Sequence, residues 1–303
     1  MEKINNILAE DTNMLNELVQ KLDIKIIERL VKGHEKKFYI ETLNGDKRLL
    51  RINDIKHYEW TKNDACAYNY ITAAGINVMR LIDMDVFFEG TLSYQLFTWY
   101  DGNDLVDALP SMKQEEQFSV GIKTGNLLRK LHALPPLFEI EPWSIRYKRI
   151  VQEKIKFYED NTDKTLNMDL LAYYLQDNLD LLSDRPQTFT HGDFNTENIM
   201  YTPDGQIGLI DLGGGKNSND PWWDFCEIPN DLNMAPHFYI GLFKGYFKGE
   251  PPLEFFHLLS YYIAFGAFEG LLDSTCENAS ERIKCVLNWF NDMKNSIPSW
   301  YLI

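Results

Sequence analysis

The sequence predicts an α+β protein of two lobes, with a strand-rich front and a helical back. Strand patterns dominate the first part of the chain, and after Asp101-Gly102 helical spacing takes over. The 303 residues are 45% hydrophobic and 25% charged, which is ample for two compact lobes and unlike a disordered chain. We therefore expect a first lobe at 1–101 and a second lobe at 102–303.

The first lobe is expected to combine strands with two helices. Asn44-Gly45 lies between two strand-forming runs and is a strong hairpin signal, and Gly75 stands where a helix should end. The expected elements are a helix at 13–22, strands at 37–43 and 48–52, a helix at 57–74, and strands at 78–82 and 94–99.

The second lobe is expected to be helical apart from one small β segment. Pro135-Pro136 ends its first long helix. The apolar stretch 258–272 contains Glu269 and is interpreted as a buried helix too short to span a bilayer. The expected elements are helices at 114–132, 145–161 and 168–182, a β segment within 188–212, and helices from there to residue 289.

Composition narrows the class of partner and compartment. The formal charge of -15 disfavours nucleic acid and anionic membranes and weakly favours a cationic partner. The four cysteines are far apart and form no C-x-x-C pair, which argues against a zinc site or a disulfide framework. With no signal-peptide pattern at the start, a cytoplasmic protein is expected. We assume a monomer, although nothing in the sequence argues against a dimer.

The residues that carry chemistry lie between His191 and Asp211. They read H-x-D-x-x-x-x-N, then a hairpin turn, then an apolar strand that ends in D-x-G. Phosphoryl transfer needs a metal to neutralise phosphate charge and a group that orients the acceptor hydroxyl and takes its proton. Asp193 suits the second task, while Asn198 and Asp211 offer the oxygen ligands that Mg²⁺ prefers. The alternative is a capped turn in which these side chains only bind backbone N–H groups.

Three stretches of the chain resemble the aminoglycoside phosphotransferase family, which shares the protein-kinase fold with choline kinases. They are HGDFNTENIM at 191–200, IGLIDLGG at 207–214 and DPWWD at 220–224, and the resemblance extends over nearly the whole chain. In that family the D-P-x-x-D element is mainly structural. Asp220 and Asp224 are therefore expected to be loop and helix-start residues.

The resemblance implies roles for individual residues and a set of ligands. It implies Asp193 as catalytic base and Asn198 and Asp211 as ligands of Mg²⁺. His191 would brace the catalytic loop. The phosphate donor would be ATP or GTP, and the acceptor would be a small molecule.

The residues expected to bind the nucleotide phosphates depart from the kinase pattern. Kinases place a lysine on the third strand to hold the α- and β-phosphates, but here the equivalent residue is Arg51, whose planar fork is not a conservative exchange. The acidic residue that pairs with Arg51 should be Asp64, with Glu59 as the second candidate. The alternative is that Arg51 is a surface strand residue. With no G-x-G-x-x-G present, Gly33 is the candidate for the phosphate-covering turn.

The adenine and acceptor sites are predicted only by analogy with the family. The segment 97–102 matches the hinge that holds the base through backbone groups, with Phe97 behind the base and Thr98 and Tyr100 beside it. The alternative is an aromatic edge strand packed in the core. A cationic acceptor would be held beneath Asp193 by acidic side chains and indole rings, for which the candidates are Glu227, Asp231, Glu269, Trp222 and Trp223.

Several functions remain open at this point. A choline, homoserine, sugar or amino-sugar kinase would carry the same motif as an aminoglycoside kinase. A non-catalytic, nucleotide-binding pseudokinase is favoured only by Arg51 and the sparse glycine loop. A protein-serine/threonine kinase is disfavoured because no A-P-E element or long activation loop follows Asp211.

Overall fold

The computed structural model of the chain divides into two compact units, and each is described by itself. One unit comprises Met1–Gly102 with Gly208–Ile210, and the other comprises Asn103–Ile207, Asp211–Gly213 and Asn217–Ile303. The expected α+β fold class is confirmed. The structure describes residues 3–5, 9–30, 36–161, 166–213, 217–228, 234–272, 287–288, 290–292 and 297–302.

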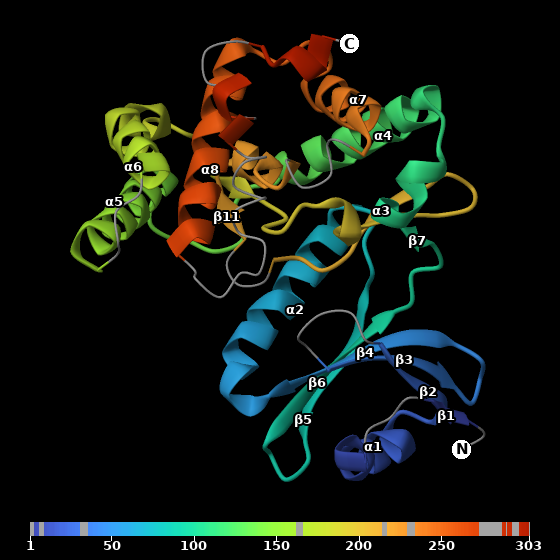
Figure 1. Cartoon of the computed structure of the whole chain (residues 1–303). Helices are drawn as coiled ribbons and strands as arrows, with labels where there is room; N and C mark the ends of the chain where they lie inside the picture. The colour runs from blue at the N-terminus through green and yellow to red at the C-terminus, as the bar shows by residue number, and fades with distance from the viewer. Residues whose placement is uncertain are drawn as a thin grey trace. The chain divides into compact units, whose positions relative to one another are not determined.

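The first unit is built on a six-stranded sheet in the order β1-β2-β3-β4-β6-β5 (Figure 1). The β1–β2 pair is parallel, and the pairs from β2 to β5 are antiparallel. The elements are β1 (Lys3–Asn5), α1 (Ala9–Lys21), β2 (Ile24–Leu30), β3 (Lys36–Thr42), β4 (Lys47–Asp54), α2 (Tyr58–Ala73), β5 (Leu81–Phe87) and β6 (Leu92–Thr98).

Most elements of this unit lie where the residue patterns predict them. The hairpin between β3 and β4 turns at Gly45, whose φ of 84° is a conformation that glycine adopts without steric cost. The strand expected at 78–82 is wrong in its position, because β5 begins only at Leu81. Its exposed carboxylates Asp83 and Asp85 hide the strand pattern, and they suit β5 because it lies at the edge of the sheet.

One face of this sheet is covered by α1. Leu15 and Leu18 of the helix are buried in the same apolar cluster as Phe38, Ile40 and Leu50 of the sheet. Each such side chain contributes about 1.5–3 kcal/mol relative to an exposed one. This core fixes β4, the strand that carries Arg51, together with its neighbour β3.

The second unit is mainly helical. Its helices are α3 (Leu105–Ala108), α4 (Gln114–His132), α5 (Trp143–Asn161), α6 (Leu166–Asp177), α7 (Pro236–Phe247) and α8 (Leu253–Leu272). Its short strands are β7 (Asn103–Asp104), β8 (Thr188–Phe189), β9 (Ile199–Tyr201) and β11 (Ser218–Asn219), with pairs β7–β9 and β8–β11 antiparallel. Strand β10 (Ile207–Leu209) begins in this unit at Ile207, and its last two residues belong to the first unit. The helix expected at 168–182 is interrupted, since α6 ends at Asp177 and a 3₁₀ turn follows at Leu179–Leu182.

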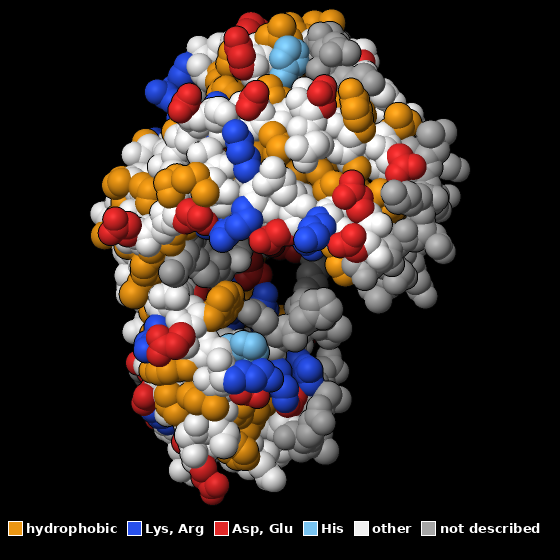
Figure 2. All heavy atoms as spheres, turned by 90° about the vertical axis from the view of Figure 1, so that its left-hand side faces the viewer, with side chains coloured by type: hydrophobic (Ala, Val, Ile, Leu, Met, Phe, Trp, Pro, Cys, Tyr) orange, Lys and Arg blue, Asp and Glu red, His pale blue; other side chains and the backbone are white. Residues whose placement is uncertain are grey.

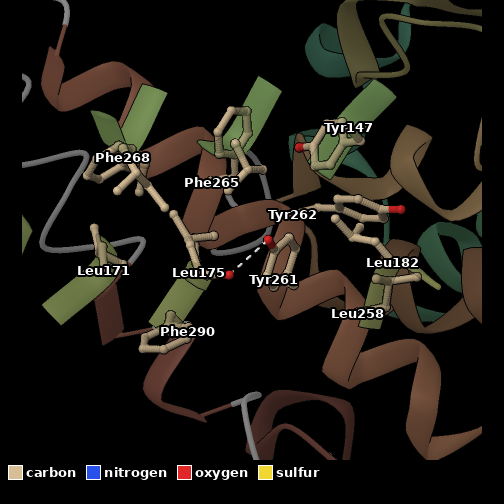
Figure 3. Packing of buried hydrophobic residues seen from close by; sticks show 14 of the residues in the cluster. Tyr147, Leu171, Leu175, Leu182, Leu258, Tyr261, Tyr262, Phe265, Phe268 and Phe290 are labelled. Atoms are coloured by element: carbon tan, nitrogen blue, oxygen red, sulfur yellow. Dashed lines mark hydrogen bonds between the residues drawn. The ribbon is translucent and has the colours of Figure 1, made fainter. Parts of the chain in front are cut away.

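The apolar helix α8 corrects one expectation. It begins at Leu253, directly after Pro251-Pro252, and is 20 residues long. With a mean hydropathy of 1.3 over an 18-residue window, it is long and apolar enough to cross a membrane. However, 67% of that window is buried inside the protein. Figure 3 shows α8 side chains packed against α5 and α6, where Tyr261 donates a hydrogen bond to the Leu175 carbonyl at 3.1 Å. This burial is typical of a core helix.

Helices α4 and α7 pack unusually closely because glycines line both surfaces. A Cβ on Gly121 or Gly125 of α4 would lie 2.1 Å from a backbone oxygen of α7. A Cβ on Gly241 or Gly245 of α7 would lie 2.2 or 2.3 Å from a backbone oxygen of α4. Real Cβ contacts are far longer, so only glycine permits this backbone-to-backbone approach. The contact fixes the spacing of the two helices at their C-terminal ends.

Candidate active site

The H-x-D-x-x-x-x-N stretch folds into a tight loop around the Asp193 carboxylate. Asn198 Nδ2 donates to the Asp193 carbonyl at 2.9 Å and to its Oδ2 at 2.8 Å, and Asn195 Nδ2 donates to Oδ1 at 3.0 Å. The Asp193 side chain is exposed. The two amides therefore hold a solvent-facing carboxylate in one orientation, as a proton acceptor requires.

Asn195 is a residue of this loop that sequence reasoning missed. Its Oδ1 accepts hydrogen bonds from the backbone N–H groups of Glu197 and Asn198 at 3.0 and 3.2 Å, and so caps the 3₁₀ turn Thr196–Asn198. The available signal was an asparagine directly before a short T-E-N turn, a typical N-cap position. Asn195 thus links the turn that carries Asn198 to the orientation of Asp193.

The donor atoms near this loop fit a divalent cation. Both hydrogen bonds of Asn198 to Asp193 use its amide nitrogen, which leaves the amide oxygen as the atom suited to a metal. Within the described part of the chain, no group of three or more His, Cys, Asp or Glu side chains could hold a metal. Mg²⁺ commonly binds one or two protein oxygens together with substrate phosphates, so this sparse donor set suits it.

The segment that carries Asp211 lies beside the H-x-D loop. Gly213 N donates to the His191 carbonyl at 2.8 Å, and a Cβ on Gly213 would lie only 2.4 Å from the carbonyl carbon of Gly192. Asp211 has a φ of 51°, which is uncommon for a residue other than glycine. Such outliers persist where the surrounding structure determines them. The close backbone contact brings the D-x-G end of the strand to the H-x-D loop.

His191 is buried within the loop. Its Nδ1 accepts from the Asp193 N–H at 3.3 Å, and its carbonyl accepts from Asn217 Nδ2 at 2.8 Å. Its ring also contacts Phe194 edge-on at a centroid distance of 5.9 Å. These contacts are of the kind that the loop-bracing interpretation requires, and they keep the ring away from solvent.

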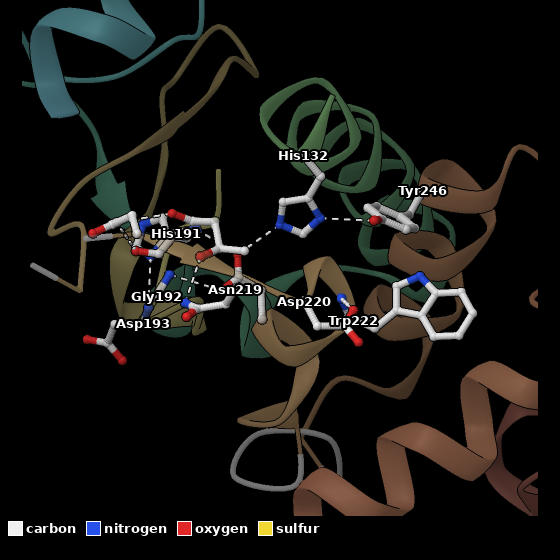
Figure 4. Close-up of polar contacts among 11 residues, drawn as sticks. His132, His191, Gly192, Asp193, Asn219, Asp220, Trp222 and Tyr246 are labelled. Carbon is white, nitrogen blue, oxygen red and sulfur yellow. Dashed lines mark hydrogen bonds and ion pairs between the residues drawn. The ribbon is translucent and has the colours of Figure 1, made fainter. Parts of the chain in front are cut away.

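The D-P-x-x-D element supports the loop through Asp224, whereas Asp220 lies beside Trp222 at the start of the turn between them (Figure 4). Asp224 accepts from His191 N at 2.7 Å, from Gly192 N at 2.9 Å and from His132 Nε2 at 2.8 Å. Burial alone would raise the pKa of Asp224, but the hydrogen bond from His132, the nearby charges and the Gly192 N–H hold it below its usual value. Asp224 therefore remains a carboxylate at neutral pH.

Asp220 anchors the beginning of the 3₁₀ turn Pro221–Phe225. It accepts from the Trp222 N–H at 2.9 Å, from Arg185 at 2.5 and 3.0 Å, and from the Tyr262 hydroxyl at 2.8 Å. Arg185 is a further residue that sequence reasoning missed. A buried carboxylate with four donors is fully satisfied, which agrees with the structural role expected for Asp220.

Arg51 of β4 lies in the interior of the first unit. Its side chain is 2% exposed, so the alternative of a surface strand residue is wrong. Its Nη1 lies 3.8 Å from an Asp64 carboxylate oxygen, and its guanidinium lies 5.1 Å from the centre of the Phe97 ring. Glu59 instead pairs with Lys62 at 2.6 Å, so Asp64 is the acid beside Arg51.

The predicted hinge residues have partners within the first unit. Phe97 is fully buried. Thr98 Oγ1 accepts from the Arg80 N–H at 2.9 Å. The Tyr100 hydroxyl accepts from Asn77 Nδ2 at 2.7 Å, and its ring lies so close to Gly208 that a Cβ there would be 2.2 Å from the hydroxyl oxygen. The Tyr100 ring is thus held against the chain at Gly208.

The described acceptor-binding candidates lie beside different partners. Glu227 is half-buried and accepts from Cys226 Sγ at 3.9 Å, whereas Glu269 pairs with Lys154 at 2.9 Å. One face of the Trp222 ring is covered by Arg185, whose guanidinium lies 4.0 Å from the ring centre. Two further candidates, Gly33 and Asp231, lie outside the described residues.

Comparison with known proteins decides the family. The model of the phosphotransferase enzyme family matches residues 26–256 of this chain, which is most of its length. The chain belongs to this family. The predicted resemblance to aminoglycoside phosphotransferases is thereby confirmed, and so is the expectation that the chain is a phosphotransferase. A comparison with curated protein sequences gave no match.

Solved structures of small-molecule kinases share the fold of this phosphotransferase family member. A choline/ethanolamine kinase family protein from Mesorhizobium loti is 16% identical, with a TM-score of 0.66 over 95% of this chain and 98% of the other. A GDP and kanamycin complex of an APH(2") enzyme is 14% identical, with a TM-score of 0.67 over 95% and 99%. An amicoumacin kinase in complex with AMP-PNP, Ca²⁺ and Ami is 13% identical, with a TM-score of 0.61 over 95% and 94%.

Proposed function

We propose that this protein transfers the γ-phosphate of ATP or GTP to a hydroxyl group of a small, cationic molecule in the cytoplasm. The observation that supports this most is the exposed Asp193 carboxylate, held by the amides of Asn195 and Asn198 in a member of a phosphotransferase family. Residues 1–101 would bind the nucleotide, and residues 102–303 would carry catalysis and bind the acceptor. The protein would act as a monomer.

The proposed chemistry assigns a task to each side chain of the loop. Asp193 accepts the proton of the acceptor hydroxyl while the oxygen of that hydroxyl forms a bond to the γ-phosphorus. The bond between the γ-phosphorus and the β,γ-bridging oxygen breaks, and ADP or GDP leaves. Asn198 and Asp211 would hold Mg²⁺, which neutralises phosphate charge. Arg51, kept beside Asp64, would face the α- and β-phosphates.

Replacing Asp211 by Ala should weaken binding of the magnesium–nucleotide complex by about tenfold or more, because a metal ligand is lost. Calorimetric titration of nucleotide with Mg²⁺ and again with EDTA measures this effect, which should disappear in EDTA. Asp204→Ala, which removes one carboxylate from the nearby hairpin turn, is the matched control and should bind nucleotide normally. Equal affinity of Asp211→Ala and the unaltered protein would remove Asp211 from the metal site.

Net charge and the similar structures both bear on the identity of the acceptor. The charge of -15 favours a cation, but acidic and basic side chains are interspersed on the face in Figure 2 rather than gathered into one acidic patch. Several similar structures are described as aminoglycoside phosphotransferases, and two of these hold gentamicin or kanamycin, so an aminoglycoside-like acceptor comes first. Choline, homoserine and amino sugars are the alternatives within the same class.

The test is nucleotide turnover by the purified protein with Mg²⁺ across a panel of acceptors. The panel contains aminoglycosides, macrolides, choline, homoserine and amino sugars, each with ATP and with GTP. Release of ADP or GDP that depends on one acceptor, and is lost in Asp193→Asn, supports the kinase and identifies its substrate class. Nucleotide binding without turnover would instead favour the pseudokinase, for which the observation is Arg51 in the lysine position.

A further inference from the structure

A chain of hydrogen bonds leads from the C-terminal ends of α4 and α7 to the backbone of the catalytic loop (Figure 4). The Tyr246 hydroxyl lies 2.9 Å from His132 Nδ1, and His132 Nε2 lies 2.8 Å from Asp224 Oδ2. The same carboxylate accepts the N–H groups of His191 and Gly192 at 2.7 and 2.9 Å. These are the two residues directly before Asp193.

The chemistry of the groups fixes the direction of each bond. The Asp224 carboxylate can only accept, so His132 Nε2 carries a proton. In the tautomer whose single ring proton is on Nε2, Nδ1 accepts a hydrogen bond from the Tyr246 hydroxyl. Burial and the nearby Asp224 charge raise the pKa of Tyr246, which keeps that hydroxyl protonated. The donors therefore converge on Asp224, from His132 on one side and from the loop N–H groups on the other.

This chain of hydrogen bonds is buried and rigidly mounted. Exposure is 6% for His132, 2% for Asp224 and 9% for Tyr246. Hydrogen bonds are stronger in such a low-dielectric interior, and a polar group left unpaired there is costly. The glycine contact between α4 and α7 sets the spacing of the helix ends from which the His132 and Tyr246 side chains extend.

We propose that His132 and Tyr246 are positioning residues for the phosphotransfer reaction, acting through Asp224 on the peptide groups before Asp193. This inference rests on the proposed function. With His132 in place, Asp224 has one orientation that accepts both loop N–H groups. Gly192, with a φ of 86°, leads directly to Asp193, so a rotation of these peptide groups moves the base. Without the His132 bond, Asp224 turns and the loop loses its fixed anchor.

The test compares three variants with a matched control. Tyr246→Phe removes only the hydroxyl, His132→Leu removes both ring nitrogens, and His132→Gln restores one N–H donor toward Asp224. The control is Tyr261→Phe, which removes another buried tyrosine hydroxyl of the same unit, bonded to the Leu175 carbonyl. Each variant is assayed for kcat, for KM, for thermal unfolding, and for amide exchange of the peptide 190–195 by mass spectrometry.

The expected results separate positioning from stability. His132→Leu should lower kcat by about 30-fold and Tyr246→Phe by about fivefold, with nucleotide KM unchanged, because the loop hydrogen bonds are weakened. His132→Gln should recover most of the kcat lost in His132→Leu. Exchange of the loop amides should rise at least about tenfold in His132→Leu. Tyr261→Phe should lose stability comparably, with kcat and loop exchange unchanged.

Two outcomes would overturn the inference. One is a folded His132→Leu protein with kcat and loop exchange as in the unaltered protein. The other is a Tyr261→Phe protein that loses kcat as much as Tyr246→Phe, because the effect would then follow stability alone. Failure of the proposed function is distinguishable, since the unaltered protein would show no turnover with any acceptor while the exchange experiment would still report on the loop.

Discussion

Asp193→Asn should lower acceptor-dependent turnover by about a hundredfold or more while leaving nucleotide affinity nearly unchanged. The amide matches the carboxylate in shape but cannot accept the hydroxyl proton. The nucleotide is held elsewhere in the proposed site, by the metal ligands and Arg51. Because two amide N–H donors face the Asp193 oxygens, Asp193→Ala is measured in parallel to exclude an effect of a misdirected amide.

The matched control for this change is Glu197→Gln. Glu197 is an exposed acid in the same turn, so its replacement removes one nearby charge without touching Asp193. Turnover should stay within about twofold, as is usual for a surface change. If Asp193→Asn and Asp193→Ala both retained turnover, another group would take the proton and the assignment of Asp193 would fail.

Local signals account for the parts of the fold that could be predicted from the sequence. The hairpin at Asn44-Gly45 and the end of α2 at Gly75 each depend on a glycine with positive φ, a requirement readable within a few residues. The helix α4 coincides with its predicted range because apolar spacing persists over its full length. In contrast, β5 was misplaced because its carboxylates resemble a loop unless the edge position in the sheet is known.

The site was predictable only where its residues form a short motif. Asp193, Asn198 and Asp211 belong to one recognisable stretch, and the loop hydrogen bonds span five residues or fewer. His132 and Asp224, however, are 92 residues apart, and His132 and Tyr246 are 114 apart. A histidine at the end of a helix gives no sign of such partners in one sequence. Contacts of this kind depend on how whole helices pack.

The packing of α4 on α7 should make Gly125→Ala strongly destabilising. The added Cβ would lie 2.1 Å from the Leu242 carbonyl oxygen and 2.7 Å from the Tyr246 nitrogen, and both are backbone atoms that cannot rotate away. Separating the helices should cost about 3 kcal/mol of unfolding free energy, at the upper end of overpacking effects. Urea unfolding measures this loss as a lower midpoint.

Gly266→Ala in α8 is the control, because it adds the same methyl group to a helical glycine with nothing within 4 Å of the new Cβ. There the unfolding free energy should rise by about 0.5–1 kcal/mol, since alanine favours a helix more than glycine does. The two changes thus have opposite expected signs for one chemical difference. Gly125→Ala should also reduce turnover, because parting α4 from α7 lengthens the bond between His132 and Tyr246. If both changes stabilised the protein equally, α4 and α7 would not be in close backbone contact. Their packing would then not hold the catalytic loop.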